Sequence, residues 1–120
     1  RGLGDVYKRQ VLGATGQADD HNLANILIAY KYSKKLNIEL ISNYFRIMFI
    51  KEKKIIKTKK NMRVSMISLD INNKISSSGL QYELNHESLD TFTKGISNKS
   101  MENEFTISAE KELILFTEIV

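Results

Sequence analysis

Hydrophobic positions in the first half of the chain recur with the period of an α-helix. One stripe comprises Leu23, Ile26, Leu27 and Tyr30. A second stripe comprises Leu40, Ile41, Tyr44, Phe45 and Met48. Because a period near 3.6 places each stripe on one face of a helix, the pattern predicts helices over residues 22–36 and 39–50, packed side by side. A short apolar run before them, residues 11–15, predicts a strand.

The second half of the chain shows shorter apolar runs separated by turn residues. Residues 51–60 are rich in lysine and predict a solvated connector. After this connector, Asn72 and Asn73 supply turn chemistry between two strand-like runs. Residues 62–84 are therefore expected to form an antiparallel hairpin.

The last part of the chain predicts a second hairpin, formed by residues 105–107 and 113–117 around the polar residues between them. The resulting order is one strand, two helices and four strands. This order predicts an α/β (α+β) layered domain, with two adjacent helices packed on a mainly antiparallel sheet.

We expect residues 1–10 to be an adapter-derived scar, different in origin from the remainder of the chain. Residues 5–10 resemble the translation of a sequencing adapter, and a scar of this kind is excluded from fold reasoning. Residues 113–120 are mostly apolar and have no polar tail after them. We therefore expect residues 11–120 to be a partial domain that is truncated at both ends.

Composition limits the function classes. The chain has 18 basic and 14 acidic residues; without the three basic and one acidic residues of positions 1–10, 15 and 13 remain, and the net charge falls from +4 to +2. This balance gives little support to a nucleic-acid partner. The absence of cysteine excludes a disulfide scaffold and a zinc ribbon. No apolar run approaches the roughly 18 residues that a bilayer requires. We expect a cytoplasmic protein with no membrane segment.

Two segments far apart in the sequence end where a ligand or metal site can form. The first is the turn of Gly13, Ala14, Thr15 and Gly16, which leads into the first predicted helix. The second is the apolar run that ends at Glu118. In open sheets, ligand sites gather at strand ends of this kind. We expect the two segments to meet as halves of one site.

In this order, the segments resemble motifs of the metal-dependent PPM-type (type 2C) protein phosphatases, in the stage II sporulation protein E (SpoIIE) branch. Residues 12–18 are similar to a Gly-Asp-x-(Ser/Thr)-Gly-(His/Lys)-Gly turn, and residues 64–70 to a strand that ends in Asp. Residues 78–80 fall at an Ala-Gly-His turn, and residues 113–119 resemble Leu-Leu-Leu-Tyr-Thr-Asp-Gly. The resemblance extends over nearly all of residues 11–120.

This resemblance implies a hydrolase of bacterial signalling, a protein serine/threonine phosphatase that acts on a phosphorylated regulatory protein such as an anti-sigma-factor antagonist. In such a family, aspartates hold Mn²⁺ or Mg²⁺ ions, which activate a water molecule. Here Gly13 or Ala14 stands at the first metal aspartate, and Glu118 stands at the last. One carboxylate cannot assemble a two-metal site. The fragment itself is therefore predicted to be inactive, with no intact catalytic residue.

Alternatives remain open for several of these features. Asp19 and Asp20 are either displaced metal ligands or capping residues of the first helix. A catalytically dead pseudophosphatase scaffold would keep the fold and recognise a phosphoprotein without turnover. A third alternative is a nucleic-acid-binding domain that uses residues 51–60, although this run lacks interleaved aromatic residues.

Overall fold

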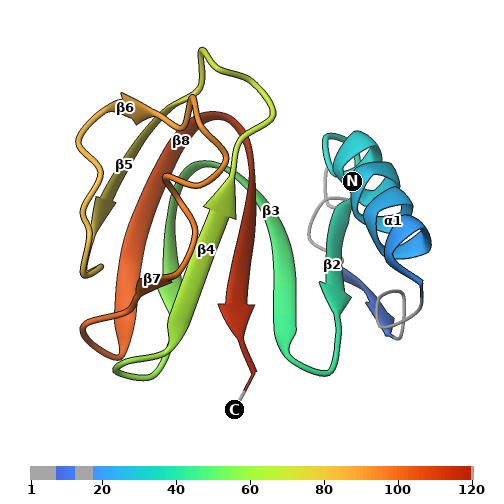
Figure 1. Cartoon of the computed structure of the whole chain (residues 1–120), viewed down its shortest axis with the longest axis horizontal. Coiled ribbons are helices and arrows are strands. Elements are labelled where there is room, and N and C mark those ends of the chain that lie inside the picture. Colours follow the sequence, from blue (N-terminus) through green and yellow to red (C-terminus); the bar gives the residue numbers. More distant parts are fainter. Residues whose placement is uncertain (1–7, 13–17, 120) are drawn as a thin grey trace, which may run out of the picture.

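In the computed structural model, residues 8–12 and 18–119 are described. They form one helix and one continuous, bent sheet (Figure 1). The elements in chain order are β1 (Lys8–Leu12), α1 (Asp19–Tyr32), β2 (Asn37–Ile41), β3 (Phe45–Lys57), β4 (Arg63–Ile67), β5 (Lys74–Ser78), β6 (Glu87–Ser88), β7 (Asn98–Lys99) and β8 (Glu104–Glu118). The predicted adapter boundary falls inside β1 and stays a prediction.

The helix α1 lies beside β2, at the end of the sheet formed by β1 and β2 (Figure 1). Two acidic residues, Asp19 and Asp20, occupy its first turn, and Lys31 occupies its last turn. Both charge types complement the helix dipole. The helix buries Ala29 against a cluster formed by Leu40, Ile47 and Ile114. The first predicted helix is therefore present, shifted toward the N-terminus by a few residues.

The second predicted helix, over residues 39–50, is wrong, because this segment forms β2, a turn and the start of β3. The two strands are antiparallel, with Leu40 opposite Ile47. Ser42 closes the turn, since its Oγ accepts the N–H of Phe45 at 2.9 Å and of Tyr44 at 3.2 Å. The predicted fold class is wrong for the same reason: in residues 8–12 and 18–119, one helix packs on a predominantly β structure.

The lysine-rich segment predicted as a connector is mostly the second half of β3. Its residues pair in register with the first half of β8, from Glu52 opposite Ala109 to Lys57 opposite Glu104. In this half of the strand only Ile56 is buried, and the four lysines, Glu52 and Ile55 are exposed. The long pairing to β8 explains why so polar a run is extended.

The predicted hairpin within residues 105–117 is wrong, because β8 is one strand of 15 residues. It pairs with β3 along its whole length, and the register shifts between Ile50 and Glu52. Glu52 itself has a positive φ of 66°. An irregularity of this kind bends a strand without ending it. The polar residues near Ala109 therefore mark a bend, where a turn was expected.

The predicted hairpin over residues 62–84 is also wrong, because β4 and β5 do not pair with each other. Each pairs with a different half of β8: Val64 lies opposite Thr117, and Ile75 lies opposite Ala109. Because β8 is bent, its C-terminal half can pair with β4 while its N-terminal half pairs with β5. The larger of the two buried clusters includes residues of β4 and β8, among them Met66, Phe105 and Leu115.

The turn between β4 and β5 has the chemistry expected for it. The N–H of Asn72 donates to the Asp70 carboxylate at 2.8 Å, and the N–H of Asn73 donates to the Asp70 carbonyl at 3.1 Å. The Nζ of Lys111 donates to the same carboxylate at 3.1 Å. The bond from Asn72 and then the bond from Lys111 hold the pKa of Asp70 below its ordinary value of 3.8.

We expect Asp70→Asn to destabilise the protein near neutral pH and to have a diminishing effect in acid. A lowered pKa means that ionised Asp70 stabilises the fold above its ordinary pKa, and that this stabilisation is lost as the pH falls through the lowered pKa. Urea unfolding of wild type and variant at a series of pH values measures the difference. Asp90→Asn, at an exposed position, is the control. A difference that is independent of pH would contradict the expectation.

The only helix in the described ranges, α1, has 14 residues. A bilayer-spanning helix needs about 20 apolar residues. None of the described residues therefore belongs to a helix that could cross a membrane.

Candidate functional site

Several strands end at one edge of the sheet, which we call the strand-end edge. Leu12 at the end of β1 pairs with Ile41 at the end of β2, Ile41 pairs with Arg46, and Arg46 pairs with Thr117 near the end of β8. Figure 1 shows β2 and β8 ending at this edge, where β4 begins. Three strand spacings separate Leu12 from Thr117, which is roughly 14 Å.

The structure thus places the end of β1 and Glu118 at the same edge of the sheet. The predicted turn residues Gly13, Ala14, Thr15 and Gly16 lie outside the described residues. Their contribution to a site stays a prediction.

Aromatic and amide groups surround a cleft of about 300 Å³ at this edge, which we call the strand-end cleft. It lies between the first turns of α1, the β2–β3 turn and the end of β8. Its lining residues are Asn22, Ile26, Ser42, Asn43, Tyr44, Phe45, Ile47 and Phe116. The rings of Phe45 and Phe116, both on this lining, pack edge to face with their centroids 6.2 Å apart. Tyr44 is 74% exposed and is available to a ligand.

Charged groups lie next to the strand-end cleft. The guanidinium of Arg63 lies 5.4 Å from the centre of the Phe45 ring, a cation–π contact. The backbone N–H of Arg63 donates to the Glu118 carboxylate at 3.2 Å. Glu118 therefore joins the start of β4 to the end of β8, and its second oxygen remains available for a ligand.

The other predicted metal ligands, Asp19 and Asp20, are exposed in the first turn of α1. Ala18 occupies the N-cap position and makes no side-chain cap, while the Asp20 carboxylate accepts the N–H of His21 at 2.9 Å. Neither aspartate therefore occupies the N-cap position, and the bond from His21 to Asp20 is the capping-type contact that the structure shows. In the part of the chain that the structure describes, no three Asp, Glu, His or Cys side chains come together as metal ligands. A metal role for Asp19, Asp20 or Glu118 stays a prediction.

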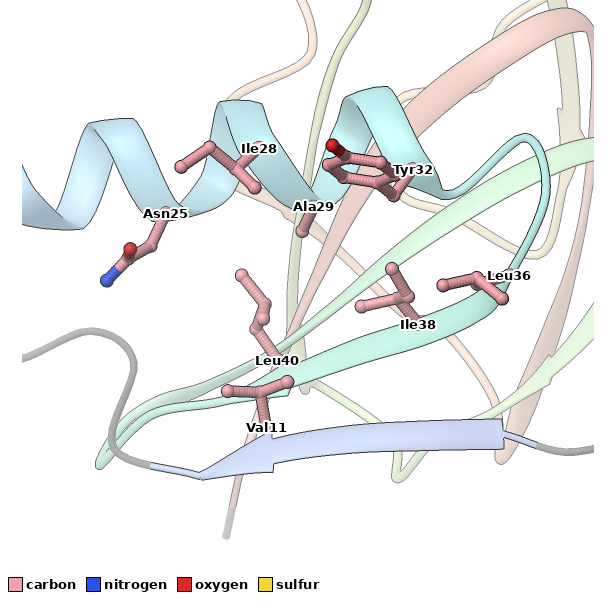
Figure 2. Close-up of a pocket in the computed structure, with 8 residues that line it drawn as sticks. All are labelled: Val11, Asn25, Ile28, Ala29, Tyr32, Leu36, Ile38 and Leu40. Atoms are coloured by element: carbon pink, nitrogen blue, oxygen red, sulfur yellow. The ribbon is translucent and has the colours of Figure 1, made fainter.

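A second, larger hollow of about 590 Å³ lies between α1 and the strands β1 and β2 (Figure 2). In Figure 2, Ala29 of the helix and Leu40 of β2 face one another across it. Its lining consists of Val11, Asn25, Ile28, Ala29, Tyr32, Leu36, Ile38 and Leu40. These residues include no carboxylate, imidazole or ammonium group. This apolar groove offers packing surface, whereas the strand-end cleft offers both aromatic and charged groups.

Comparison with known proteins identifies the family. The model of the thiamin pyrophosphokinase vitamin B1 binding domain matches residues 52–114, which is more than half of the 120 residues. The chain belongs to the thiamin pyrophosphokinase family. The matched range runs from the bend of β3 to the middle of β8. It contains most residues of the larger buried cluster, while Met48, Ile50 and Leu115 lie outside it.

Solved structures of thiamin pyrophosphokinases have the same fold. The enzyme from Bacillus subtilis is 26% identical to this chain, with a TM-score of 0.79, and the match covers 94% of this chain and 56% of that one. The Candida albicans enzyme is 19% identical, with a TM-score of 0.81 over 94% of this chain and 45% of that one. The Geobacillus thermodenitrificans enzyme is 20% identical, with a TM-score of 0.78 over 94% and 54%. No curated protein matches the sequence. The chain thus spans about half the length of these structural relatives.

The family match overturns the resemblance to PPM-type phosphatases. The expected hydrolase activity and the phosphorylated regulatory partner are wrong, and the pseudophosphatase and nucleic-acid alternatives have no support either. The resemblance depended on an element order with two helices and two hairpins. The second helix and both hairpins are absent from the described structure. The short motifs therefore do not lie on the elements that the phosphatase resemblance required.

The aromatic residues of the strand-end cleft were not predicted as site residues. Tyr44 and Phe45 fell in the second predicted helix, and Phe116 fell in the second predicted hairpin. The polar pair Ser42 and Asn43, between two apolar runs, was the signal for a turn that would have exposed Tyr44.

Proposed function

We propose that this chain supplies the vitamin B1-binding part of a thiamin pyrophosphokinase, an enzyme that transfers a pyrophosphoryl group to thiamin. The match of residues 52–114 to the vitamin B1 binding domain carries this proposal. A cytoplasmic location belongs to the same proposal, because a chain without cysteine suits a reducing compartment.

We place thiamin in the strand-end cleft. Thiamin carries a positively charged thiazolium ring and an aminopyrimidine ring, both flat. The faces of Tyr44, Phe45 and Phe116 suit such rings, because aromatic faces attract cations and stack on flat groups. The amide of Asn43 lies on the same lining and can bond to a pyrimidine nitrogen.

The charged groups at the strand-end edge suit a phosphoryl transfer. The Arg63 guanidinium can hold phosphate oxygens, because its planar fork matches their geometry. Mg²⁺ or Mn²⁺ would neutralise the donor's polyphosphate, and such an ion is usually held by one or two carboxylates together with the phosphates. The exposed carboxylates of Asp19, Asp20 and Glu118 fit this donor set. They are the residues that we propose for it.

We expect the folded chain to bind thiamin and expect Tyr44→Ala to weaken binding about fivefold, because it removes one cation–π partner. Isothermal titration calorimetry with thiamin measures the affinity. Tyr82→Ala is the matched control: Tyr82 is 64% exposed and lies outside the cleft lining. Circular dichroism establishes that both variants fold.

Three results would be informative. If the folded chain does not bind thiamin at millimolar concentration, the proposed function is wrong. If the two tyrosine variants bind equally well, thiamin binds elsewhere and the assignment of the cleft is wrong. If only Tyr44→Ala weakens binding, both parts of the proposal are supported.

A further inference from the structure

A polar cleft lies at the C-terminal end of α1, at the other end of the helix from the strand-end cleft. We call it the lysine cleft. It has a volume of about 320 Å³ and is formed by the loop after α1 together with β3 and β8. Its lining residues are Ser33, Lys34, Lys35, Leu36, Asn37, Phe49, Lys51, Lys54 and Glu112. A helix of 14 residues is roughly 20 Å long, so this cleft is distinct from the strand-end cleft at the start of α1.

The ammonium groups that line this cleft form no direct ion pair in the part of the chain that the structure describes. Among the described residues, Lys57, Lys94 and Lys111 each form an ion pair with a carboxylate. The four cleft lysines, Lys34, Lys35, Lys51 and Lys54, form no ion pair within the same part of the chain. Like charges gathered in one hollow concentrate a positive potential there, which attracts anions.

The helix dipole explains only half of this cluster. Lys34 and Lys35 follow the last turn of α1, where cations are favourable. Lys51 and Lys54 come from β3 and do not belong to the segment that follows the helix. They are three positions apart, so a regular strand would direct them to opposite faces. The register shift at Glu52, whose φ is 66°, interrupts this alternation, and both lysines line the same cleft.

One carboxylate shares the cleft with the four lysines. Burial raises the pKa of Glu112, while the charges of Lys51 and Lys34 act in the opposite direction. One glutamate cannot neutralise four lysines. The local excess of positive charge therefore remains even with Glu112 ionised.

We propose that the lysine cleft binds a small polyphosphate anion, such as pyrophosphate, tripolyphosphate or the phosphate tail of a nucleotide. Four ammonium groups around one hollow match several adjacent phosphate charges better than a single carboxylate or phosphate. The hydroxyl of Ser33 and the amide of Asn37 add uncharged donors on the same lining. The one aromatic residue of the lining, Phe49, is half-buried, so the cleft has no exposed platform for the stacked bases of a nucleic acid. This site does not depend on the thiamin proposal.

The test is calorimetric titration of the folded chain with inorganic tripolyphosphate, with pyrophosphate and ATP as further arms. We expect Lys51→Gln/Lys54→Gln to weaken tripolyphosphate binding about tenfold, because two charged contacts are lost. Lys59→Gln/Lys60→Gln is the matched control, since it removes the same charge from exposed positions outside the cleft. We expect this control to change the affinity less than about twofold, through long-range charge alone.

Glu112→Gln provides a test with the opposite sign. Removing a negative charge from the lining should strengthen tripolyphosphate binding several-fold, which loss of structure would not do.

The proposal is overturned if the folded chain does not bind tripolyphosphate, if both lysine pairs weaken binding equally, or if Glu112→Gln weakens it. Binding of a random oligonucleotide without binding of the three phosphates would also overturn it. The arm with the highest affinity identifies the source of the phosphates. Thiamin binding by the Lys51→Gln/Lys54→Gln variant should be unchanged, so the two proposals fail separately.

Discussion

Replacing Asn73 with alanine is expected to lower the free energy of unfolding by about 3 kcal/mol. The Asn73 side chain is fully buried between the β4–β5 turn and the bend of β8. Its Nδ2 donates to the carbonyls of Lys111 at 2.9 Å and Glu112 at 3.1 Å and to the Ser68 Oγ at 3.2 Å, and its Oδ1 accepts the N–H of Lys111 at 2.8 Å. Alanine would leave these groups of β8 without their partners at a partly buried site, where water replaces the lost hydrogen bonds only incompletely. Urea unfolding followed by circular dichroism measures the loss.

The neighbouring residue provides the control. Asn72 is exposed, and only its backbone N–H is used in the turn. Asn72→Ala should therefore change stability by less than about 0.5 kcal/mol. Asn73→Asp keeps the acceptor for Lys111 but directs a carboxylate at two carbonyl oxygens, so it should be at least as harmful as alanine. Equal stability of the Asn72 and Asn73 alanine variants would show that the bend of β8 does not depend on this side chain.

The first helix was predictable from sequence and the second was not, and the difference lies in how each segment is buried. β3 buries residues on both faces: Ile47 faces the cluster under α1, while Met48 and Ile50 face the larger cluster. A strand covered on both sides has no alternation of apolar and polar residues. The resulting run of apolar residues fits a helical stripe equally well, so hydrophobic periodicity alone could not separate the two.

Strand pairing was not predictable because it is decided by contacts far apart in the chain. The turn at Asn72 and Asn73 indicated correctly where the chain reverses, but a local signal cannot name the partner of each strand. Here β8 is the partner of both β4 and β5. The bend that makes this possible contains Ala109 and polar neighbours, which locally look like a hairpin turn.

The shared edge of the two strand ends was easier to predict than the chemistry at that edge. A strand followed by a glycine turn and a distant strand ending at Glu118 suggested a common edge, and the end of β1 and Glu118 do lie on one edge. Strand-end turns and carboxylates occur on many folds with many activities. The short motifs therefore could not distinguish the phosphatase family from the thiamin pyrophosphokinase family. Of the residues that distinguish this cleft, Tyr44 was assigned to the second predicted helix and Phe116 to the second predicted hairpin.

Replacing Gly95 with alanine is expected to destabilise the protein by about 4 kcal/mol, the largest effect of any substitution proposed for it. Gly95 lies against β4, where its carbonyl accepts the N–H of Met66 at 2.9 Å. A Cβ at this position would lie 2.4 Å from the Met66 carbonyl oxygen and 2.8 Å from its Cγ. The nearest atom is backbone within a strand, so the contact cannot be relieved by a change of rotamer.

The loop must therefore move away from β4 in Gly95→Ala, which breaks the bond to the Met66 N–H and opens the core between Met66 and Leu89, both buried in the same cluster. Thermal and urea unfolding measure the loss, and Thr93→Ala, at an exposed position in the same turn, is the control. Because the steric cost acts only in the folded state, the variant should unfold at lower urea concentration with an unchanged dependence on urea. A stability within about 1 kcal/mol of wild type would mean that the loop accommodates a methyl group, and that its close approach to β4 is not what holds this side of the sheet together.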